Sequence, residues 1–538
     1  MLVFGDHCEI ASPSERLRAM SRDLTALAAT PSGIERHALM VGVLIDAGQL
    51  QQGVEDAAGP SAAFSRFLYQ LAQCVIRSWD SSFGEIGSLP LVPEVVLPAS
   101  VELKMPEGFA FYAVYPEDYI EAARRLKLVG APRVIGIRSI GTTLGAVTAA
   151  ALGAPPPVTV RPVGDPFARR VELPEEIVDE TVHYVVVDEG PGLSGSSFGA
   201  VADWLEERGV LLERIAFLPS HGGGPGRHAS ASHRERWEAA QRVPADFDAR
   251  FLSELFGPLE PISAGSPVER LKFLARPNGE RLLLKFAGLG SIGADKLDIA
   301  RTLHAAGFTA EPLGLIHGFL VERWCDDALR LAAGDKPVRE MGEYIGIRAR
   351  LFPAPDGSGA TIADLLAMCR RNLRLALGKQ VASAIDRWNA ATLALAVHRV
   401  RSDNKLDRDE WLRRPDGRLL KTDALDHHQA HDLVGCQDMA WDIAGAIVEF
   451  ALSYDDIRQL IEAAEAAAGR RVNPDLLSFY RVAYCCFRLG AARMVAELCS
   501  DAAERERMSS RAMHYETAVI SLLRHDYCCF TSQDSLVD

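Results

Sequence analysis

The sequence predicts a helical N-terminal region, then an α/β domain built on a mostly parallel sheet, then an α+β half in which a small sheet precedes helices. Three observations predict this order. Apolar residues recur at three- and four-residue spacing up to about residue 80, which is the helical period. Strand-like and helix-like segments alternate between about 95 and 245, which is typical of βαβ units. After about residue 250, short β-like segments come first, and helical patterns dominate from about 335 to 525.

The N-terminal region, residues 1–90, is expected to contain three helices. Their apolar residues would lie on one helical face in each case. The expected ranges are Ser14–Ala29, Ile34–Ala47 and Ala62–Ser78. The proline-bearing segment Pro90–Pro98 ends the helical pattern, which places a boundary near residue 90.

The α/β domain is placed at residues 91–245. The expected strands are Arg133–Ile137, Val158–Arg161, Thr181–Val187 and Arg214–Leu218, and the expected helices are Thr142–Leu152 and Ser197–Arg208. Because helices separate the strands, the sheet should be mostly parallel. The polar stretch Ser220–Ala245 contains a glycine-rich run, Gly222–Gly226, and is expected to be a loop or linker.

The α+β half divides into residues 250–330, with a small sheet, and residues 331–538, which are mainly helical. Pro277-Asn278-Gly279 is a strong turn signal between two of the expected strands. The expected strands are Leu259–Ser263, Val268–Ala275, Arg281–Phe286, Leu313–Ile316 and Phe319–Glu322, and a helix is expected at Ala294–Ala306. A polar stretch at 401–440 interrupts the later helices.

The composition excludes several function classes. With 58 Lys and Arg against 72 Asp and Glu among 538 residues, the net charge is −14, which disfavours nucleic-acid binding. We find no apolar run of the roughly 20 residues that a membrane span needs, and no secretory signal pattern. The 10 cysteines include no CxxC pair, so we expect reduced thiols and a cytoplasmic protein that does not act at membranes.

A first candidate site follows the strand that ends at Val187. The adjacent carboxylates Asp188 and Glu189 come directly after it, and a Gly/Ser loop, Gly190–Ser197, then opens a helix. Glycine lets backbone N–H groups approach a phosphate, and a helix N-terminus favours negative charge. The carboxylates could bind ribose hydroxyls or a hydrated Mg²⁺. The pattern therefore indicates a sugar-phosphate site, with an ordinary strand–turn–helix as the plainer alternative.

A second anion-binding loop is expected in the preceding strand–loop–helix unit. Its polar residues lie between the strand Arg133–Ile137 and the next helix, and the candidates are Arg138, Ser139, Gly141, Thr142 and Thr143. Two such loops at one sheet edge suit a ligand that has phosphates at both ends.

The segment Val185–Ser197 resembles the ribose-phosphate motif of type I phosphoribosyltransferases, and Arg138–Thr143 is similar to their pyrophosphate loop. The resemblance covers about 150 residues. It implies that Asp188 and Glu189 are catalytic-site acids that bind the ribose of phosphoribosyl pyrophosphate or a ribose phosphate. It further implies a 5-phosphate loop made by Gly192, Ser194, Gly195, Ser196 and Ser197. The loop is one residue longer than usual in this family.

A second constellation lies in the α+β half. Lys285 stands on an expected strand, Asp298 follows on the expected helix, and a turn with Gly265 and Ser266 lies between the first two strands. A lysine at such a place neutralises nucleotide phosphates in kinases, where an acid on the next helix pairs with it. Further along, a turn at Pro415-Asp416-Gly417 leads to Asp423 at a strand end.

This order resembles small-molecule kinases of the aminoglycoside phosphotransferase and choline kinase type, which have a protein-kinase-like fold. The resemblance implies ATP and Mg²⁺ as cofactors. It implies that Asp403 is the catalytic base, that Asp423 binds the metal, and that Asp442 braces the catalytic loop. The HGDxxxxN motif is absent, and Glu410 stands near the usual asparagine position as a second candidate metal ligand.

Two alternatives concern the histidines of this half. The sequence Asp426-His427-His428, with His431-Asp432, resembles the motif of DHH phosphoesterases, which bind Mn²⁺. Those enzymes need acidic motifs on earlier strands, which residues 335–400 do not supply. Histidines that hydrogen-bond within a loop are the favoured interpretation.

The leading hypothesis is a bifunctional transferase of nucleotide or ribosyl metabolism. One half would transfer or cleave a phosphoribosyl group with Mg²⁺, and the other would phosphorylate a small molecule with ATP. The alternative is a catalytically decayed nucleotide or ribose-phosphate sensor, or a regulatory scaffold. In either case the expected partners are small molecules, and homo-oligomerisation is left open.

Overall fold

The computed structural model describes residues 8–130, 132–262, 270–355, 357–429, 433–499 and 501–531. Two compact units can be distinguished. The α/β unit comprises Cys8–Asp298 and Glu311–Trp324, and the helical unit comprises Ile299–Ala310 and Cys325–Asp538. Helix α10 (Gly290–Ala305) begins in the first unit and ends in the second. These units cut across the four ranges expected from the sequence.

The main sheet of the α/β unit is parallel throughout, as predicted. Its strand order is β4-β3-β7-β8-β9. The strands are β3 (Arg133–Ile137), β4 (Val158–Val160), β7 (Tyr184–Val187), β8 (Ile215–Leu218) and β9 (Gln241–Arg242). Every residue of β7 and β8 is buried, which explains why their apolar runs do not alternate with polar residues.

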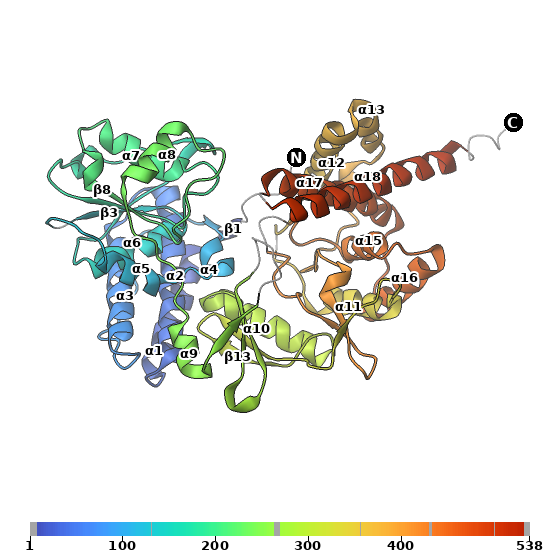
Figure 1. Cartoon of the computed structure of the whole chain (residues 1–538), viewed down its shortest axis with the longest axis horizontal. Helices are drawn as coiled ribbons and strands as arrows, with labels where there is room; N and C mark the ends of the chain where they lie inside the picture. Colours follow the sequence, from blue (N-terminus) through green and yellow to red (C-terminus); the bar gives the residue numbers. More distant parts are fainter. Residues whose placement is uncertain are drawn as a thin grey trace. The chain divides into compact units, whose positions relative to one another are not determined.

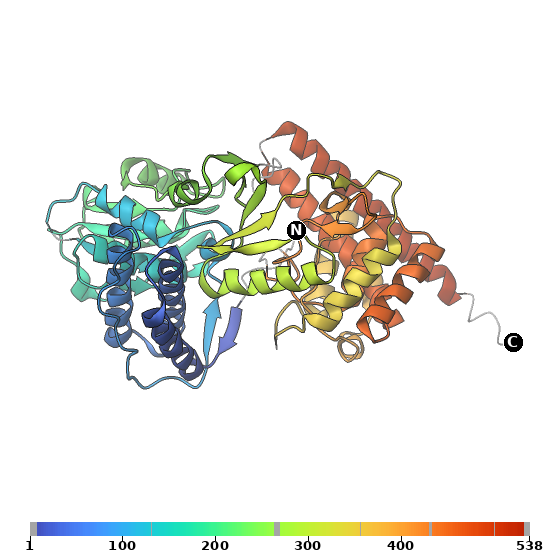
Figure 2. The ribbon, with the colours of Figure 1, turned by 90° about the horizontal axis from the view of Figure 1, so that it is seen from below.

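Helices cover both faces of this sheet (Figure 1). The predicted N-terminal helices are present as α1 (Pro13–Ala29), α2 (Ile34–Ala58) and α3 (Ala62–Asp80), and they pack side by side, as their blue ribbons in Figure 2 show. Helices α2 and α3 lie against α6 (Ile140–Ala151), while α7 (Ser196–Glu206) covers the other face. Helix α2 extends well beyond the predicted end at Ala47, because most of its second half is buried.

The predicted loop at Ser220–Ala245 is a correction. Part of it forms α8 (Ala231–Ala239), whose N-cap Ser230 accepts a hydrogen bond from the backbone of His233, and the chain then adds β9 to the sheet. Burial of Trp237 explains this order, since its ring stacks on Phe217 with centroids 5.5 Å apart. A single aromatic side chain in a polar stretch was enough to anchor the helix.

A second, antiparallel sheet in the α/β unit has the order β10-β11-β12-β14-β13. Its strands are β10 (Leu259–Pro261), β11 (Lys272–Ala275), β12 (Leu282–Phe286), β13 (Pro312–Ile316) and β14 (Phe319–Arg323). The predicted turn Pro277–Gly279 joins β11 to β12, with Asn278 at φ 53°. One face of this sheet shares a continuous hydrophobic core with α2, α3 and α5 (Pro116–Arg124).

Smaller elements complete the α/β unit. They are the strand pairs β1 (Cys8–Ala11) with β2 (Val101–Lys104) and β5 (Val163–Asp165) with β6 (Ala168–Arg170), and the helices α4 (Glu107–Phe111) and α9 (Arg250–Phe256). The β5–β6 hairpin packs against α7. It therefore lies beside the Gly/Ser loop that opens this helix.

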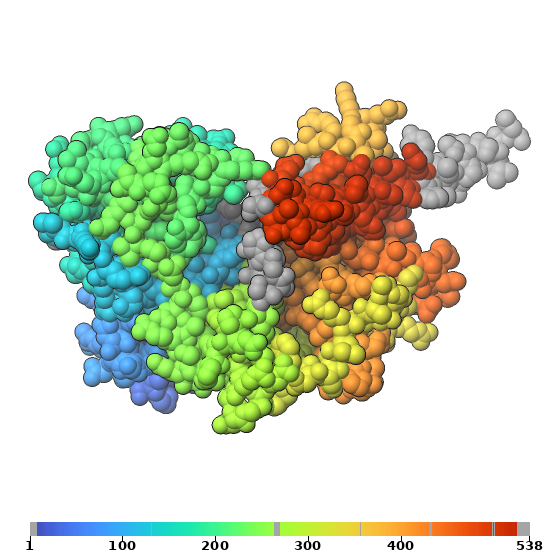
Figure 3. All heavy atoms as spheres, in the orientation of Figure 1, coloured from blue at the N-terminus to red at the C-terminus, as the bar shows by residue number. Residues whose placement is uncertain are grey.

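The helical unit is built from paired helices around a small three-stranded sheet. The main helices are α11 (Val338–Leu351), α12 (Ile362–Leu377), α15 (Met439–Glu449), α16 (Tyr454–Ala468), α17 (Pro474–Leu498) and α18 (Ala502–Thr531). The sheet has the order β15-β16-β17, with β15 (Leu329–Arg330), β16 (Trp411–Arg413) and β17 (Leu419–Lys421). Helices α17 and α18 pack along each other and form the red surface in Figure 3. Among the described residues, we find no helix with the length and apolar character of a bilayer span.

Candidate functional site

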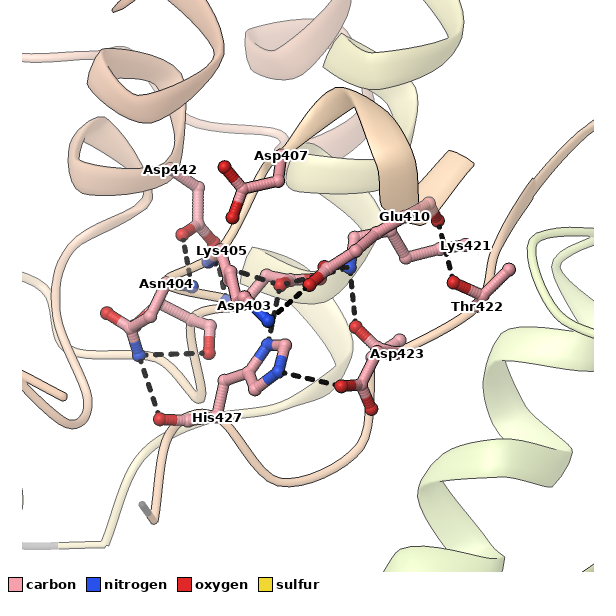
Figure 4. Close-up of polar contacts among 12 residues, drawn as sticks. Asp403, Asn404, Lys405, Asp407, Glu410, Lys421, Thr422, Asp423, His427 and Asp442 are labelled. Atoms are coloured by element: carbon pink, nitrogen blue, oxygen red, sulfur yellow. Dashed lines mark hydrogen bonds and ion pairs between the residues drawn. The ribbon is translucent and has the colours of Figure 1, made fainter. Parts of the chain in front are cut away.

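The polar centre of the helical unit gathers three carboxylates and three cations around the ends of β16 and β17 (Figure 4). The carboxylates belong to the predicted site residues Asp403, Glu410 and Asp423. The cations belong to Lys405, Lys421 and His427, which the sequence did not single out as cationic site residues. The structure thus brings the predicted acids together and adds their counter-charges.

Lys421 lies at the middle of this cluster. Its Nζ is 2.5 Å from Oε2 of Glu410 and 3.5 Å from Oδ1 of Asp403, and its side chain is fully buried. Burial alone would lower the pKa of Lys421, but Asp403 and Glu410 raise it by more. The lysine therefore stays charged. It occupies the space between the two carboxylates.

Asp403 is fully enclosed. Its Oδ2 accepts a hydrogen bond from the hydroxyl of Tyr344, and its Oδ1 lies 3.1 Å from Nδ1 of His427. Burial alone would raise the pKa of Asp403, but Lys421 and His427 hold it below its usual range. Because both oxygens have partners and the side chain is 0 % exposed, this geometry does not fit the predicted role of a base that contacts a substrate.

His427 links two of the acids. Its Nδ1 faces Asp403, and its Nε2 lies 3.3 Å from Oδ2 of Asp423. Burial alone would lower the pKa of His427, but Asp423 and Asp403 raise it to about 9. These contacts favour the protonated imidazole. Asp423, Asp426 and His427 also lie close enough together to share a metal ion, so metal binding by His427 stays a prediction, and His431 and Asp432 lie outside the described residues.

Asp442 holds the backbone of the loop at Asp403 and Asn404. Its Oδ2 accepts the backbone N–H of Asp403 and its Oδ1 accepts that of Asn404, each at 2.8 Å. Asn404 has φ 65° and its side-chain amide donates to the carbonyl of Gly435. The residue that directly follows this braced pair is Lys405. Its Nζ lies 2.6 Å from Oε1 of Glu410.

Protein cations already contact the acids that would bind a magnesium ion. Mg²⁺ takes oxygen ligands that carry net negative charge. Here the ammonium groups of Lys405 and Lys421 contact Glu410, and the imidazole of His427 contacts Asp423. For Glu410 and Asp423, metal binding stays a prediction.

The other predicted residues of this half lie in the α/β unit or outside the described residues. Lys285 is a buried residue of β12, and Asp298 lies on α10. Gly265 and Ser266 fall outside the described residues.

The acid pair of the α/β unit lies where the sequence placed it. Asp188 and Glu189 follow β7 at the carboxyl edge of the parallel sheet. Burial raises the pKa of Asp188 to about 7, and burial together with the charge of Asp188 raises that of Glu189 to about 8. The backbone N–H of Glu189 donates to Oδ1 of Asp188 at 2.9 Å. For Asp188 and Glu189, binding of a sugar or a cation stays a prediction.

The serine hydroxyls of the predicted 5-phosphate loop have hydrogen-bond partners within the protein. Ser194 and Ser196 both donate to the carbonyl of Pro166, at 3.0 and 2.8 Å. The backbone N–H of Gly195 donates to the carbonyl of Pro191, and that of Ser196 to the Ser194 hydroxyl. The β5–β6 hairpin thus takes the bonds that a phosphate would receive. For Gly192 and Ser197, phosphate binding stays a prediction.

The residues of the predicted pyrophosphate loop also contact other parts of the protein, and pyrophosphate binding by them stays a prediction. Arg138 donates to Asp56, with a nitrogen–oxygen distance of 3.1 Å, and to Thr159. Thr142 and Thr143 are 0 % exposed, since α2 packs on this face of α6. The backbone of Ser139 has φ 111°, and Gly141 lies where an added Cβ would come within 2.6 Å of the Val187 carbonyl. The loop therefore packs against the protein interior.

Comparison with known proteins gives a limited picture. No protein-family model matches the chain, and no curated protein matches it significantly. Among solved structures, the choline kinase LicA from Streptococcus pneumoniae matches with 15% identity and TM-score 0.36, over 51% of this chain and 97% of that chain. An aminoglycoside phosphotransferase from Alicyclobacillus acidocaldarius matches with 12% identity and TM-score 0.33, over 49% and 92%.

A choline/ethanolamine kinase family protein from Mesorhizobium loti matches with 16% identity and TM-score 0.34, over 51% of this chain and 94% of that chain. TM-scores below 0.5 do not by themselves establish a shared fold or an activity. The functional proposal therefore rests on the residues of the site.

Proposed function

We propose that residues 250–525 form a kinase-like region that binds a nucleotide without transferring its γ-phosphoryl group. The protein would then act as a ligand sensor or a regulatory scaffold. The observation that carries this proposal is a charged lysine, Lys405, at the place where a kinase needs its base. Lys405 follows the pair braced by Asp442, and its ammonium group is bonded to Glu410.

The catalytic-loop spacing supports this assignment. Protein kinases carry H-R-D-L-x-x-x-N, in which the aspartate is the base and the asparagine binds a metal. The stretch from Asp403 to Glu410 reads D-N-K-L-D-R-D-E. When Leu406 is placed on the leucine of that motif, Lys405 takes the place of the base and Glu410 that of the asparagine. Asp403 then takes the place of the histidine, in agreement with its buried position.

A lysine at this place blocks general-base catalysis. The base of phosphoryl transfer accepts the proton of the attacking hydroxyl, so it needs an available lone pair. Burial alone would lower the pKa of Lys405, but Glu410 and Asp423 raise it above its usual range. At neutral pH the group therefore carries three protons and has no lone pair. The lysine at the position of the base and the contacts of Glu410 with two ammonium groups both support binding without phosphoryl transfer.

Nucleotide binding is the part of kinase function that these replacements leave in place. Lys285 on β12 matches the strand lysine that neutralises nucleotide phosphates. Because Glu410 already contacts the ammonium groups of Lys405 and Lys421, we expect that nucleotide binding does not need Mg²⁺. For the α/β unit we propose that Asp188 and Glu189 bind a ligand. Phosphoribosyl transfer is not supported there, because Ser194 and Ser196 donate their hydrogen bonds to Pro166.

Calorimetric titration of the full chain with ATP tests the proposal. We expect binding of similar affinity in chelator and in excess Mg²⁺. Lys285→Met should weaken binding by an order of magnitude or more, since it removes a phosphate-neutralising charge. The matched control is Lys379→Met, which removes an exposed lysine of α13 (Lys379–Ala382). Absence of ATP binding by the folded wild-type chain would reject the proposal, and so would binding that requires Mg²⁺.

A further inference from the structure

Three side chains from distant parts of the sequence meet in the interior of the α/β unit. His37 lies on α2, Glu117 lies in the first turn of α5, and His317 lies in the turn between β13 and β14. Nε2 of His37 is 2.6 Å, and Nε2 of His317 is 2.9 Å, from the same oxygen, Oε1 of Glu117. All three side chains are at most 3 % exposed.

Only one of the two oxygens of the Glu117 carboxylate has hydrogen-bond partners among the described residues. Oε1 of Glu117 accepts from both imidazoles, but its buried Oε2 has no hydrogen-bond partner in the part of the chain that the structure describes. Within the same described residues, no lysine or arginine forms an ion pair with Glu117. A buried carboxylate is costly unless it is paired or coordinates a metal ion. The cluster thus leaves one buried carboxylate oxygen without a hydrogen-bond partner among the described residues.

The donor types match one class of metal. Two imidazole nitrogens and one carboxylate are the ligands of His₂Glu zinc sites. The three ligand atoms lie within 4.8 Å of one another. Ligand atoms on a tetrahedral zinc ion lie roughly 3.3 Å apart, given bond lengths of about 2.0–2.1 Å. Side-chain shifts of less than about 1 Å would therefore let the ion take the place of the observed hydrogen bonds.

The surroundings of His37 are those of a ligand imidazole. Its Nδ1 lies 2.9 Å from Oγ of Ser78 on α3, which is itself fully buried. An imidazole that binds a metal through one nitrogen usually donates the other N–H to a protein acceptor, and this fixes the ring. Ser78 can take that part.

We propose that His37, Glu117 and His317 bind one zinc ion in a distorted tetrahedral geometry, in which both oxygens of Glu117 contact the ion. The site is closed and far from the Lys405 cluster in sequence, so its role is structural. It joins α2 and α5 of the parallel-sheet domain to the β13–β14 turn of the antiparallel sheet. This inference does not depend on the proposed nucleotide binding.

Metal content of the full-length chain tests the inference. A chelator first removes bound metal from the protein, which is then equilibrated with Zn²⁺ and passed through gel filtration. Inductively coupled plasma mass spectrometry measures the zinc that remains bound. We expect about one zinc per chain in the wild type and in the control His514→Gln, whose imidazole is exposed on α18. His37→Gln and His317→Gln, which keep a hydrogen-bonding side chain, should each lose most of the zinc.

Cobalt substitution provides a signal that a metal-free, hydrogen-bonded cluster would not give. Wild-type protein loaded with Co²⁺ should show the visible absorption of a tetrahedral site, and His317→Gln should lose it while circular dichroism stays unchanged. If the folded wild type retains no zinc and gives no such absorption, the cluster is a hydrogen-bonded clamp and the inference is overturned. Equal zinc retention by wild type and both glutamine variants would overturn it as well.

Discussion

The ammonium group of Lys421 lies 2.5 Å from a carboxylate oxygen of Glu410 and 3.5 Å from one of Asp403. One buried cation thus joins two acids that the sequence had suggested for metal binding and catalysis. This contact places a side-chain cation between the two acids. It also makes the centre of the helical unit a structural element, whose stability can be measured.

Replacement of Lys421 by methionine should be strongly destabilising. Methionine fills a similar volume but leaves Asp403 and Glu410 without their shared cation, and breaking a buried ion pair costs about 3–5 kcal/mol. The measurement is the urea midpoint of the transition that reports the helical unit. The control is Lys336→Met, which removes a partly exposed pair with Asp456 and should cost about 0–1 kcal/mol. Equal midpoints for the two variants would contradict the structural role of Lys421.

The stability of the α/β unit should fall as the pH rises from about 5 to about 8. The pKa values of Asp188 and Glu189 are about 7 and about 8 in the folded state, above their usual 3.8 and 4.5, because burial disfavours the charged forms. Over this range the folded state binds more protons than the unfolded state, so the free energy of unfolding decreases with pH.

Asp188→Asn removes one of these ionisations, and we expect this variant to lose less stability than the wild type between about pH 5 and pH 8. Thermal melts at the two pH values give the comparison. Glu172→Gln, at an exposed position, is the control and should follow the wild type. A wild type that gains stability over this range would contradict the raised pKa values.

The contact between α2 and α10, at Gly42 and Gly290, should tolerate no added carbon atom. A Cβ at Gly290 would lie 2.7 Å from Cα of Gly42 on α2, and Gly290 has φ +57°. Gly290→Ala is therefore expected to destabilise the α/β unit by about 1–3 kcal/mol. Gly334→Ala, where an added Cβ meets nothing within 4 Å, should leave the melting temperature of the chain unchanged. A Gly290→Ala variant as stable as the wild type would show that α2 and α10 do not pack this closely.

Much of the fold was predictable because burial leaves a direct record in the sequence. The strand Arg133–Ile137 was predicted with its exact bounds, since apolar runs between glycine-rich turns have few other interpretations. The stretch Ser220–Ala245 was not, because its helix depends on Trp237 finding Phe217 in the folded protein. Propensity alone did not contain that contact.

The site was predictable only in part. The acids Glu410 and Asp423 were found because they stand near recognisable turns, whereas the register that we propose puts the position of the base two residues after Asp403. The available signal was Leu406, together with the five-residue spacing from Lys405 to Glu410. The cluster of His37 and His317 gave no sequence signal, because its members are separated by hundreds of residues and meet only through packing.

Phosphoryl transfer by the full chain is the most direct test of the central claim. The chain is incubated at high concentration with ATP and Mg²⁺, with and without small alcohols and amino alcohols as acceptors, and ³¹P NMR follows the γ-phosphate. We predict that the γ-phosphate signal decays no faster than in protein-free buffer, although ATP is bound. Turnover that is lost in Lys405→Met or in Asp423→Asn would contradict the account.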